Sequence, residues 1–261
     1  MNLILLDSAA LKQKLPASDR RSIHIQQILG QACNELFVGM PGGPMGKAQV
    51  QLFASGEVGL DITWFANGEG LDSGSKALSL MVPYCRPQTC RKILRDAASL
   101  GIRRLLFFRS TKAEHSYAQS SLWRGCEWVE LLRSGVEQAF TTQVPEVQLL
   151  EGGLEEAVQV LNSLEPEPNR IHKIALDNYE SQLGVGEAVR TECSHFLAVG
   201  AERGWSQEER EIFRNNGFIL AHMGSRVMRT ETAVIAACSV ISQLSGMWRE
   251  DTGNSLGKAG K

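Results

Sequence analysis

From residue 77 onward, short apolar segments alternate with helical patterns, and this alternation restricts the possible folds more than any other feature of the chain. Apolar runs of strand length occupy residues 77–82, 104–108, 147–150, 171–176, 196–199 and 218–221. Helices are predicted over 90–100, 122–140, 154–164, 206–216 and 230–244. Because helices that connect parallel strands also cover the sheet, this order predicts an α/β domain built on a parallel sheet.

The last predicted helix is unusual, because its sequence from Ala233 to Ile241 is apolar on nearly every side. Such a helix must be covered all round, either by its own domain or by a second subunit. The helix before it begins with Ser206 and Glu209, a Ser-x-x-Glu capping box, and Gly217 follows its end.

The N-terminal part of the chain has a different pattern. One helix is predicted from Ser18 or Asp19 to about Leu29, and short strands follow over 36–38, 48–53 and 58–65. The glycine-rich segment 42–46 lacks the Lys-Ser/Thr ending of a phosphate loop, so it is predicted to be a hairpin turn. Short strands at close spacing predict a small β-barrel. The expected domains are therefore 1–72 and 77–244, followed by a flexible tail, 245–261.

Composition excludes several classes of protein. No apolar run approaches the roughly 18 residues that a membrane helix needs, and the start of the chain lacks the basic lead-in of a signal peptide. The cysteines are Cys33, Cys85, Cys90, Cys126, Cys193 and Cys238, and no two of them form a Cys-x-x-Cys pair. Neither a metal site nor a disulfide framework is expected, and we predict buried or half-buried thiols in a reducing cytoplasm.

Charge is segregated along the chain although the net charge is only −2. Residues 86–112 contain eight basic side chains and one acidic one, whereas residues 146–180 contain eight acidic and two basic ones. This pattern fits either a face that binds a polyanion or an ordinary solvated helix face. The candidates for RNA contact are Arg86, Arg91, Arg104, Arg109 and Lys112.

Two segments stand out as sites for chemistry. In the first, Phe196–Glu209, a buried strand runs through a turn containing Gly200 and Gly204 into the capped helix. In the second, Ile219–Ala233, a strand runs through a polar loop into the apolar helix. Either could be an ordinary βα turn, but α/β sheets bind ligands at the carboxyl ends of their strands, and glycine lets the backbone approach a ligand closely.

Together the two segments resemble a known family. The order Gly-x-Glu-x-Gly-aromatic-Ser-x-x-Glu, followed by Gly224-Ser225-Arg226-Val227-Met228-Arg229-Thr230-Glu231-Thr232-Ala233, is similar to the C-terminal signature of the methyltransferases that modify a uridine of small-subunit ribosomal RNA at N3. These enzymes belong to the SPOUT superfamily, whose domain contains a trefoil knot. Weaker similarity extends over most of the chain.

The resemblance implies an RNA-binding barrel of the PUA kind, a knotted C-terminal domain, a homodimer and S-adenosylmethionine as cofactor. The residues that match the cofactor site are Leu176, Val199, Gly200, Glu202, Gly204, Met223, Gly224, Val227, Met228, Arg229 and Thr232. Arg229 and Glu231 are the residues that the resemblance suggests for polar catalysis near the target base. No metal and no membrane association are implied.

The sequence also departs from the family pattern. The family's Gly-Pro-Glu-Gly-Gly is Gly200-Ala201-Glu202-Arg203-Gly204 here, and Arg203 adds bulk in the expected cofactor loop. Three hypotheses therefore stay open at this point: an RNA methyltransferase, a non-catalytic RNA- or protein-binding module with the same fold, and an enzyme that acts on a small molecule.

Overall fold

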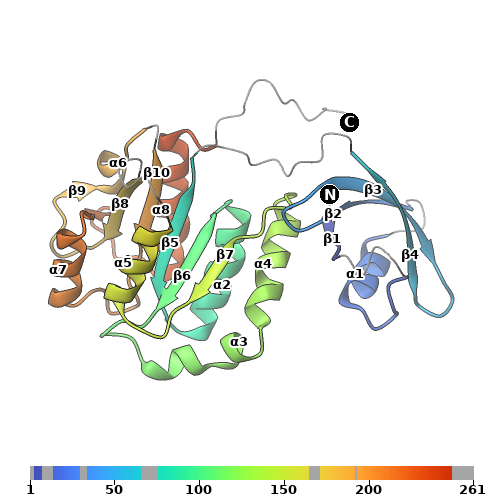
Figure 1. Cartoon of the computed structure of the whole chain (residues 1–261), viewed down its shortest axis with the longest axis horizontal. Coiled ribbons are helices and arrows are strands. Elements are labelled where there is room, and N and C mark those ends of the chain that lie inside the picture. The colour runs from blue at the N-terminus through green and yellow to red at the C-terminus, as the bar shows by residue number, and fades with distance from the viewer. Residues whose placement is uncertain are drawn as a thin grey trace. The chain divides into compact units, whose positions relative to one another are not determined.

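A computed structural model describes residues 3–7, 14–29, 34–65, 76–164, 171–191 and 193–248 (Figure 1). The chain divides into two compact units, which we describe separately. The first consists of Met1–Ser73, Leu94–Gly101 and Ser121–Pro145, and the second of Gly74–Ile93, Ile102–Ser120 and Glu146–Lys261. Residues 66–75, around the expected domain boundary, and most of the tail expected over 245–261 lie outside the described residues.

The first unit contains a mixed sheet in the order β1-β2-β3-β4. Its elements are β1 (Leu3–Leu5), α1 (Arg20–Ile28), β2 (Glu35–Gly39), β3 (Met45–Leu52) and β4 (Val58–Trp64). β1 pairs with β2 in parallel, and the other pairs are antiparallel. The side chain of Asp19 caps α1 by accepting a hydrogen bond from the Arg21 N–H. Over the described residues the sheet is open, with β1 and β4 at its edges.

The glycine-rich segment after β2 forms the predicted turn between antiparallel strands, and β3 begins within it, at Met45. From Leu60 to Trp64, β4 alternates between half-buried and exposed positions, as the alternating sequence predicts for a strand with one solvated face. A cluster that includes Ile4, Ile25, Val38 and Val58 forms the apolar core beneath this sheet.

One helix prediction was wrong. The segment 122–140 is not continuous, because α3 (Ser121–Arg124) ends before α4 (Glu127–Gln138) begins. Cys126 lies between them with a left-handed φ of 56°. That conformation cannot continue a right-handed helix, so the chain turns at Gly125–Cys126. The turn also leaves the Cys126 thiol exposed, contrary to the expectation of buried or half-buried thiols.

The second unit contains a seven-stranded, wholly parallel sheet in the order β7-β6-β5-β10-β8-β11-β9, which confirms the predicted α/β class. Its strands are β5 (Leu78–Pro83), β6 (Arg104–Phe108), β7 (Glu146–Leu149), β8 (Ile171–Leu176), β9 (Leu183–Gly184), β10 (Ser194–Ala198) and β11 (Ile219–His222). Its helical elements are the 3-10 helix η1 (His115–Gln119), α5 (Leu154–Ser163), α6 (Val185–Ala188), α7 (Gln207–Asn215) and α8 (Thr230–Ser245). α2 (Pro87–Ser99) begins in this unit, and from Leu94 onward it is assigned to the first unit.

Helices lie on both faces of this sheet (Figure 1). One core cluster joins Met81, Phe108 and Phe196 of the strands to Val158 of α5 and Phe213 of α7. α8 lies behind the strands in the same view and packs against α6, where Val240 and Leu244 approach Gly186. β5 is buried along its whole length, as a strand covered on both faces must be.

Strand order determines where a ligand can bind. The chain proceeds from β5 outward to β6 and β7, and then returns so that β10 pairs with the other side of β5. The connection after β5 therefore leads to β6, toward one lateral edge of the sheet, and the connection after β10 leads to β11, toward the other edge. In open parallel sheets, a crevice forms at such a switch point beyond the carboxyl ends of the strands.

Candidate functional site

The residues predicted to bind a cofactor come together at the carboxyl edge of the second unit's sheet. They lie at the end of β8, in the loop 199–206 after β10, in the loop 223–229 after β11 and in the first turn of α8. β10, β8 and β11 are neighbours in the sheet and run in parallel, so these loops leave from one edge. Segments more than forty residues apart in sequence thus form one candidate site.

The glycine turn, Gly200–Gly204, lies at the centre of this edge. The Gly204 N–H donates to the carbonyl of Ala201 at 2.8 Å, and Gly204 has a φ of +64°. A Cβ added at Gly200 would stand 3.2 Å from the Gly204 Cα and 3.3 Å from the Trp205 ring, so a side chain would crowd the turn there. At Gly204, an added Cβ would meet only the Tyr179 ring, at 3.8 Å.

The geometry of the turn fits close approach of a ligand to the backbone, because the space beside Gly204 is open. Arg203, the residue that departs from the family pattern, is exposed. Ala201 is buried. The Glu202 carboxylate accepts a hydrogen bond from the Arg86 N–H at 3.3 Å, which ties the loops after β10 and β5 together across the switch point.

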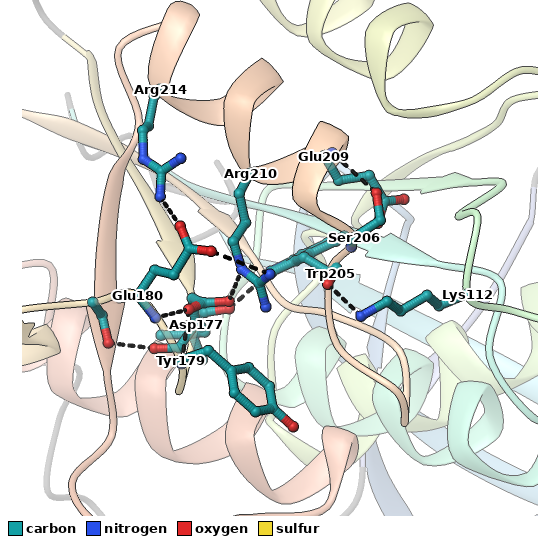
Figure 2. A network of polar contacts seen from close by, with 11 residues as sticks. Lys112, Asp177, Tyr179, Glu180, Trp205, Ser206, Glu209, Arg210 and Arg214 are labelled. Atoms are coloured by element: carbon teal, nitrogen blue, oxygen red, sulfur yellow. Dashed lines mark hydrogen bonds and ion pairs between the residues drawn. The ribbon is translucent and has the colours of Figure 1, made fainter.

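The start of α7 holds the glycine turn in place. Ser206 and Glu209 form the predicted capping box, with the Glu209 N–H donating to the Ser206 hydroxyl and the Ser206 N–H to the Glu209 carboxylate. Trp205 is buried between Phe108 and Phe213 and donates from its indole nitrogen to the Leu176 carbonyl at 2.8 Å. Lys112 donates from Nζ to the Trp205 carbonyl at 2.7 Å (Figure 2).

A buried ion pair holds the loop after β8. The Asp177 carboxylate accepts hydrogen bonds from the N–H groups of Tyr179 and Glu180, at 2.8 and 2.6 Å. It also pairs with the Arg210 guanidinium of α7 at 2.7 Å, with side chains only 1% and 8% exposed. Glu180 pairs in turn with Arg210 and Arg214 (Figure 2). Sequence reasoning missed this network, because Asp177 and Arg210 lie 33 positions apart with no motif joining them.

The loop 223–229 has fewer attachments. Its glycine, Gly224, has a φ of +96° and donates its N–H to Nδ1 of His222 at 3.1 Å. An added Cβ at Gly224 would meet nothing within 4 Å, and the side chain of Val227 is 86% exposed. At the far end of the loop, the Thr230 hydroxyl donates to the Gly200 carbonyl at 3.3 Å. This loop is therefore held near its two ends, with its middle in solvent.

The two predicted polar residues lie at the start of α8. Arg229 occupies the N-cap position, is exposed and makes no side-chain capping bond. Glu231 lies in the first turn, and its carboxylate receives a hydrogen bond from Lys92 Nζ of α2 at 2.9 Å. That bond, assisted by the charge of Lys92, holds the pKa of Glu231 below its usual value. Glu231 is therefore a carboxylate near neutral pH, and Lys92 is a neighbour that sequence reasoning did not identify.

The structure separates the predicted RNA-binding cations. Arg86, Arg109 and Lys112 lie in the loops after β5 and β6, at the same edge as the glycine turn. Arg91 is on α2. Arg104 begins β6, at the opposite edge, and pairs with Glu146 at 3.0 Å. Within the second unit, then, Arg104 does not join the other cations around the candidate site.

Two kinds of feature are absent from the described residues. No group of three or more His, Cys, Asp or Glu side chains that could hold a metal ion was found among them. No helix in the part of the chain that the structure describes is both long and apolar enough to span a membrane.

Known proteins resemble the chain in sequence and in fold. The family model of the RNA methyltransferase domain matches residues 73–242. Ribosomal RNA small subunit methyltransferase E of Treponema pallidum is 30% identical over 253 residues, covering 95% of this chain and 93% of the relative. Its counterpart in Borreliella burgdorferi, methyltransferase E 1, is 25% identical over 240 residues, covering 91% and 95%.

In fold, the chain is similar to the crystal structure of ribosomal RNA small subunit methyltransferase E from Neisseria gonorrhoeae, which is bound to S-adenosylmethionine. The TM-score is 0.73 at 20% identity, covering 94% of this chain and 98% of that one. The family model spans the whole parallel sheet of the second unit, and the sequence similarity extends over almost the entire chain. This chain therefore belongs to the RNA methyltransferase family, together with the ribosomal RNA small subunit methyltransferases E.

Proposed function

We propose that the chain transfers a methyl group from S-adenosylmethionine to N3 of a uridine in small-subunit ribosomal RNA. The observation that carries this proposal is the glycine turn at the carboxyl edge of the sheet. Gly204 presents backbone to open space, and Arg203 is exposed, so its bulk does not argue against a cofactor there. The residues that would hold the cofactor are those of the loops 199–206 and 223–229, with the end of β8.

The chain's own contribution to the reaction is positioning and charge. S-adenosylmethionine supplies a methyl group that its sulfonium already activates. Holding the uridine in line with that methyl lowers the barrier by orientation. Glu231, kept ionised by Lys92, accepts the proton of the uridine N3–H. Arg229, beside it, stabilises the negative charge that develops on the base when this proton leaves.

The same proposal covers the finer architecture. The first unit, whose sheet is open over the described residues, serves as a PUA-like RNA-binding domain, and the second as a knotted SPOUT domain of a cytoplasmic homodimer. α8 supports the dimer, because Ile235 and Leu244 are 37% and 44% exposed on a mostly apolar helix. Its own unit thus leaves part of α8 uncovered, which a second subunit would bury.

Calorimetric titration with S-adenosylmethionine tests the cofactor site. We expect one binding event per subunit and its loss in Gly204→Trp, whose side chain would fill the space beside the turn. Gly217→Trp is the matched control, since Gly217 also has a positive φ, of +77°, with nothing near an added Cβ. If the wild-type protein binds no S-adenosylmethionine, the non-catalytic binding module becomes the better hypothesis.

Nucleoside analysis of small-subunit ribosomal RNA after incubation with the protein and labelled cofactor tests the reaction. We expect 3-methyluridine, and we expect Glu231→Gln to lower kcat while leaving cofactor affinity unchanged. Label in another nucleoside would refute the assignment of uridine N3 and leave the methyltransferase activity standing.

The salt dependence of RNA binding tests whether the carboxyl edge of the sheet, with its cations, contacts RNA. If Arg86 contacts a phosphate, Arg86→Gln is expected to reduce the slope of log K against log salt concentration by about one. Arg104→Gln, at the opposite edge, should leave the slope unchanged. Equal effects of the two variants would contradict the assignment of this edge to RNA.

A further inference from the structure

Tyr179 combines exposure with a fixed backbone, which is unusual for a large aromatic residue. It is 77% exposed, although the residue two positions before it, Asp177, is 4% exposed. The backbone N–H groups of Tyr179 and Glu180 both donate to the Asp177 carboxylate. The Ser181 hydroxyl donates to the Asp177 carbonyl as well. The chain thus holds an aromatic ring in solvent on a turn that a buried carboxylate organises.

Arg210 also contacts the ring itself. Its guanidinium carbon lies 5.3 Å from the centroid of the Tyr179 ring, within the range of a cation–π contact. The same guanidinium pairs with Asp177 and Glu180, so its position is restrained as well. With one face near Arg210 and 77% of the residue exposed, the ring offers its other face to solvent. In Figure 2 the side chain of Tyr179 extends away from the ion pairs.

The ring borders the glycine turn. The atom closest to a Cβ added at Gly204 is Cε2 of Tyr179, at 3.8 Å. Tyr179 therefore stands at the rim of the space that the proposed function assigns to the methyl donor.

We propose that Tyr179 is a stacking platform for a nucleobase at the rim of the glycine turn. This inference rests on the proposed function and extends it to a specific residue. The group that Tyr179 would recognise is the flat face of a heteroaromatic base, and any nucleobase can stack on an aromatic side chain in this way. Two ligands of the reaction contain such a base: the adenine of the methyl donor and an unpaired base of the RNA.

Fluorescence quenching of a short single-stranded RNA with one 2-aminopurine tests the RNA source directly, since stacking quenches this base analogue. We expect quenching by the wild-type protein and by Tyr179→Phe, which keeps the ring. Tyr179→Ala should abolish the quenching and weaken RNA binding roughly 5- to 100-fold. Asn178→Ala, on the same exposed turn, is the matched control and should behave as wild type.

Calorimetry of the same variants with S-adenosylmethionine tests the adenine source. If adenine is the stacked base, Tyr179→Ala weakens cofactor binding by a similar factor, Tyr179→Phe does not, and RNA quenching is the same in all variants. Thermal unfolding should show all variants as stable as wild type, because the ring is exposed. If Tyr179→Ala changes neither binding of the cofactor nor binding and quenching of the RNA, the inference is wrong.

These outcomes separate the inference from the proposed function. A wild-type protein that binds no S-adenosylmethionine but quenches the RNA probe through Tyr179 refutes the function and supports the platform. A protein that methylates RNA equally well with and without the Tyr179 ring, with unchanged KM for both substrates, supports the function and refutes the platform.

Discussion

The loops on either side of the candidate site are held in different ways. The loops after β8 and β10 are attached to α7 through the Asp177–Arg210 pair, the Trp205 indole and the capping box. The loop 223–229 after β11 is attached near its ends only, and Val227 in its middle is 86% exposed. We therefore expect one side of the candidate site to be organised before a ligand binds, and ordering of the other side to use part of the binding energy.

The largest expected effect on stability comes from removing the ion pair that holds the loop after β8. Arg210→Ala leaves the Asp177 carboxylate buried without its ion-pair partner, and removing one member of such a pair costs about 3–5 kcal/mol. We expect the free energy of unfolding in urea to fall by that amount. Arg214→Ala is the matched control on the same helix: its side chain is 42% exposed, so the loss should stay below about 1 kcal/mol. Equal losses would mean that the attachment does not depend on the buried pair.

Low pH should destabilise β8 and β10 at the ends opposite to the loops of the candidate site. His172 of β8 and His195 of β10 are register partners and both buried. Burial, followed by the charge of His172, lowers the pKa of His195 to about 4. As the pH falls, His195 of the unfolded chain takes up a proton near its usual pKa of about 6.5, whereas His195 of the folded chain does so only near pH 4. The free energy of unfolding therefore falls by about 3 kcal/mol between pH 6.5 and pH 4.

Urea unfolding across this pH range measures the effect. His195→Leu should flatten the profile, whereas His24→Leu, an exposed histidine of α1, should leave it unchanged. A wild-type profile without this slope would show that the buried histidine does not limit the attached side.

A smaller effect is expected where the loop 223–229 joins α8. Lys92→Met removes the partner of Glu231, so the pKa of Glu231 should return toward its usual value. The stability that this pair contributes is present above the unfolded pKa of Glu231 and lost as the pH falls through its lowered folded pKa. Because Lys92 is half exposed, we expect a cost of no more than about 1 kcal/mol at neutral pH.

The pH dependence of kcat for methyl transfer is the second measurement on Lys92→Met. The acid limb of the kcat profile should shift to higher pH, since Glu231 then protonates more easily. An unchanged limb would mean that Glu231 takes no proton in the rate-limiting step.

The smallest effect on stability is expected within the loop itself. Val227→Ser should change the free energy of unfolding by less than about 0.5 kcal/mol, because the side chain is already in solvent. Hydrogen exchange should show amides 223–228 exchanging faster than those of Tyr179 and Glu180, and slowing when S-adenosylmethionine binds. Equal protection of both loops in the free protein would contradict the comparison.

Local patterns were enough to predict several parts of the site. The capping box predicted where α7 begins, because Ser206 and Glu209 satisfy each other's backbone within one turn. The alternation of strands and helices predicted a parallel sheet and hence a shared carboxyl edge. The interruption at Cys126 was missed, because the apolar spacing of 122–140 continues on both sides of it.

The sequence alone determined the α/β class and, through the family resemblance, the expectation of a methyltransferase, and it predicted the loops of the candidate site. Tertiary structure decided the strand order, the pairing of Asp177 with Arg210 and of Lys92 with Glu231, the separation of Arg104 from the other cations, and the exposure of Tyr179. The physical reason is range. Periodicity and capping act within one or two turns of chain, whereas ion pairs and register join residues that only the folded sheet brings together.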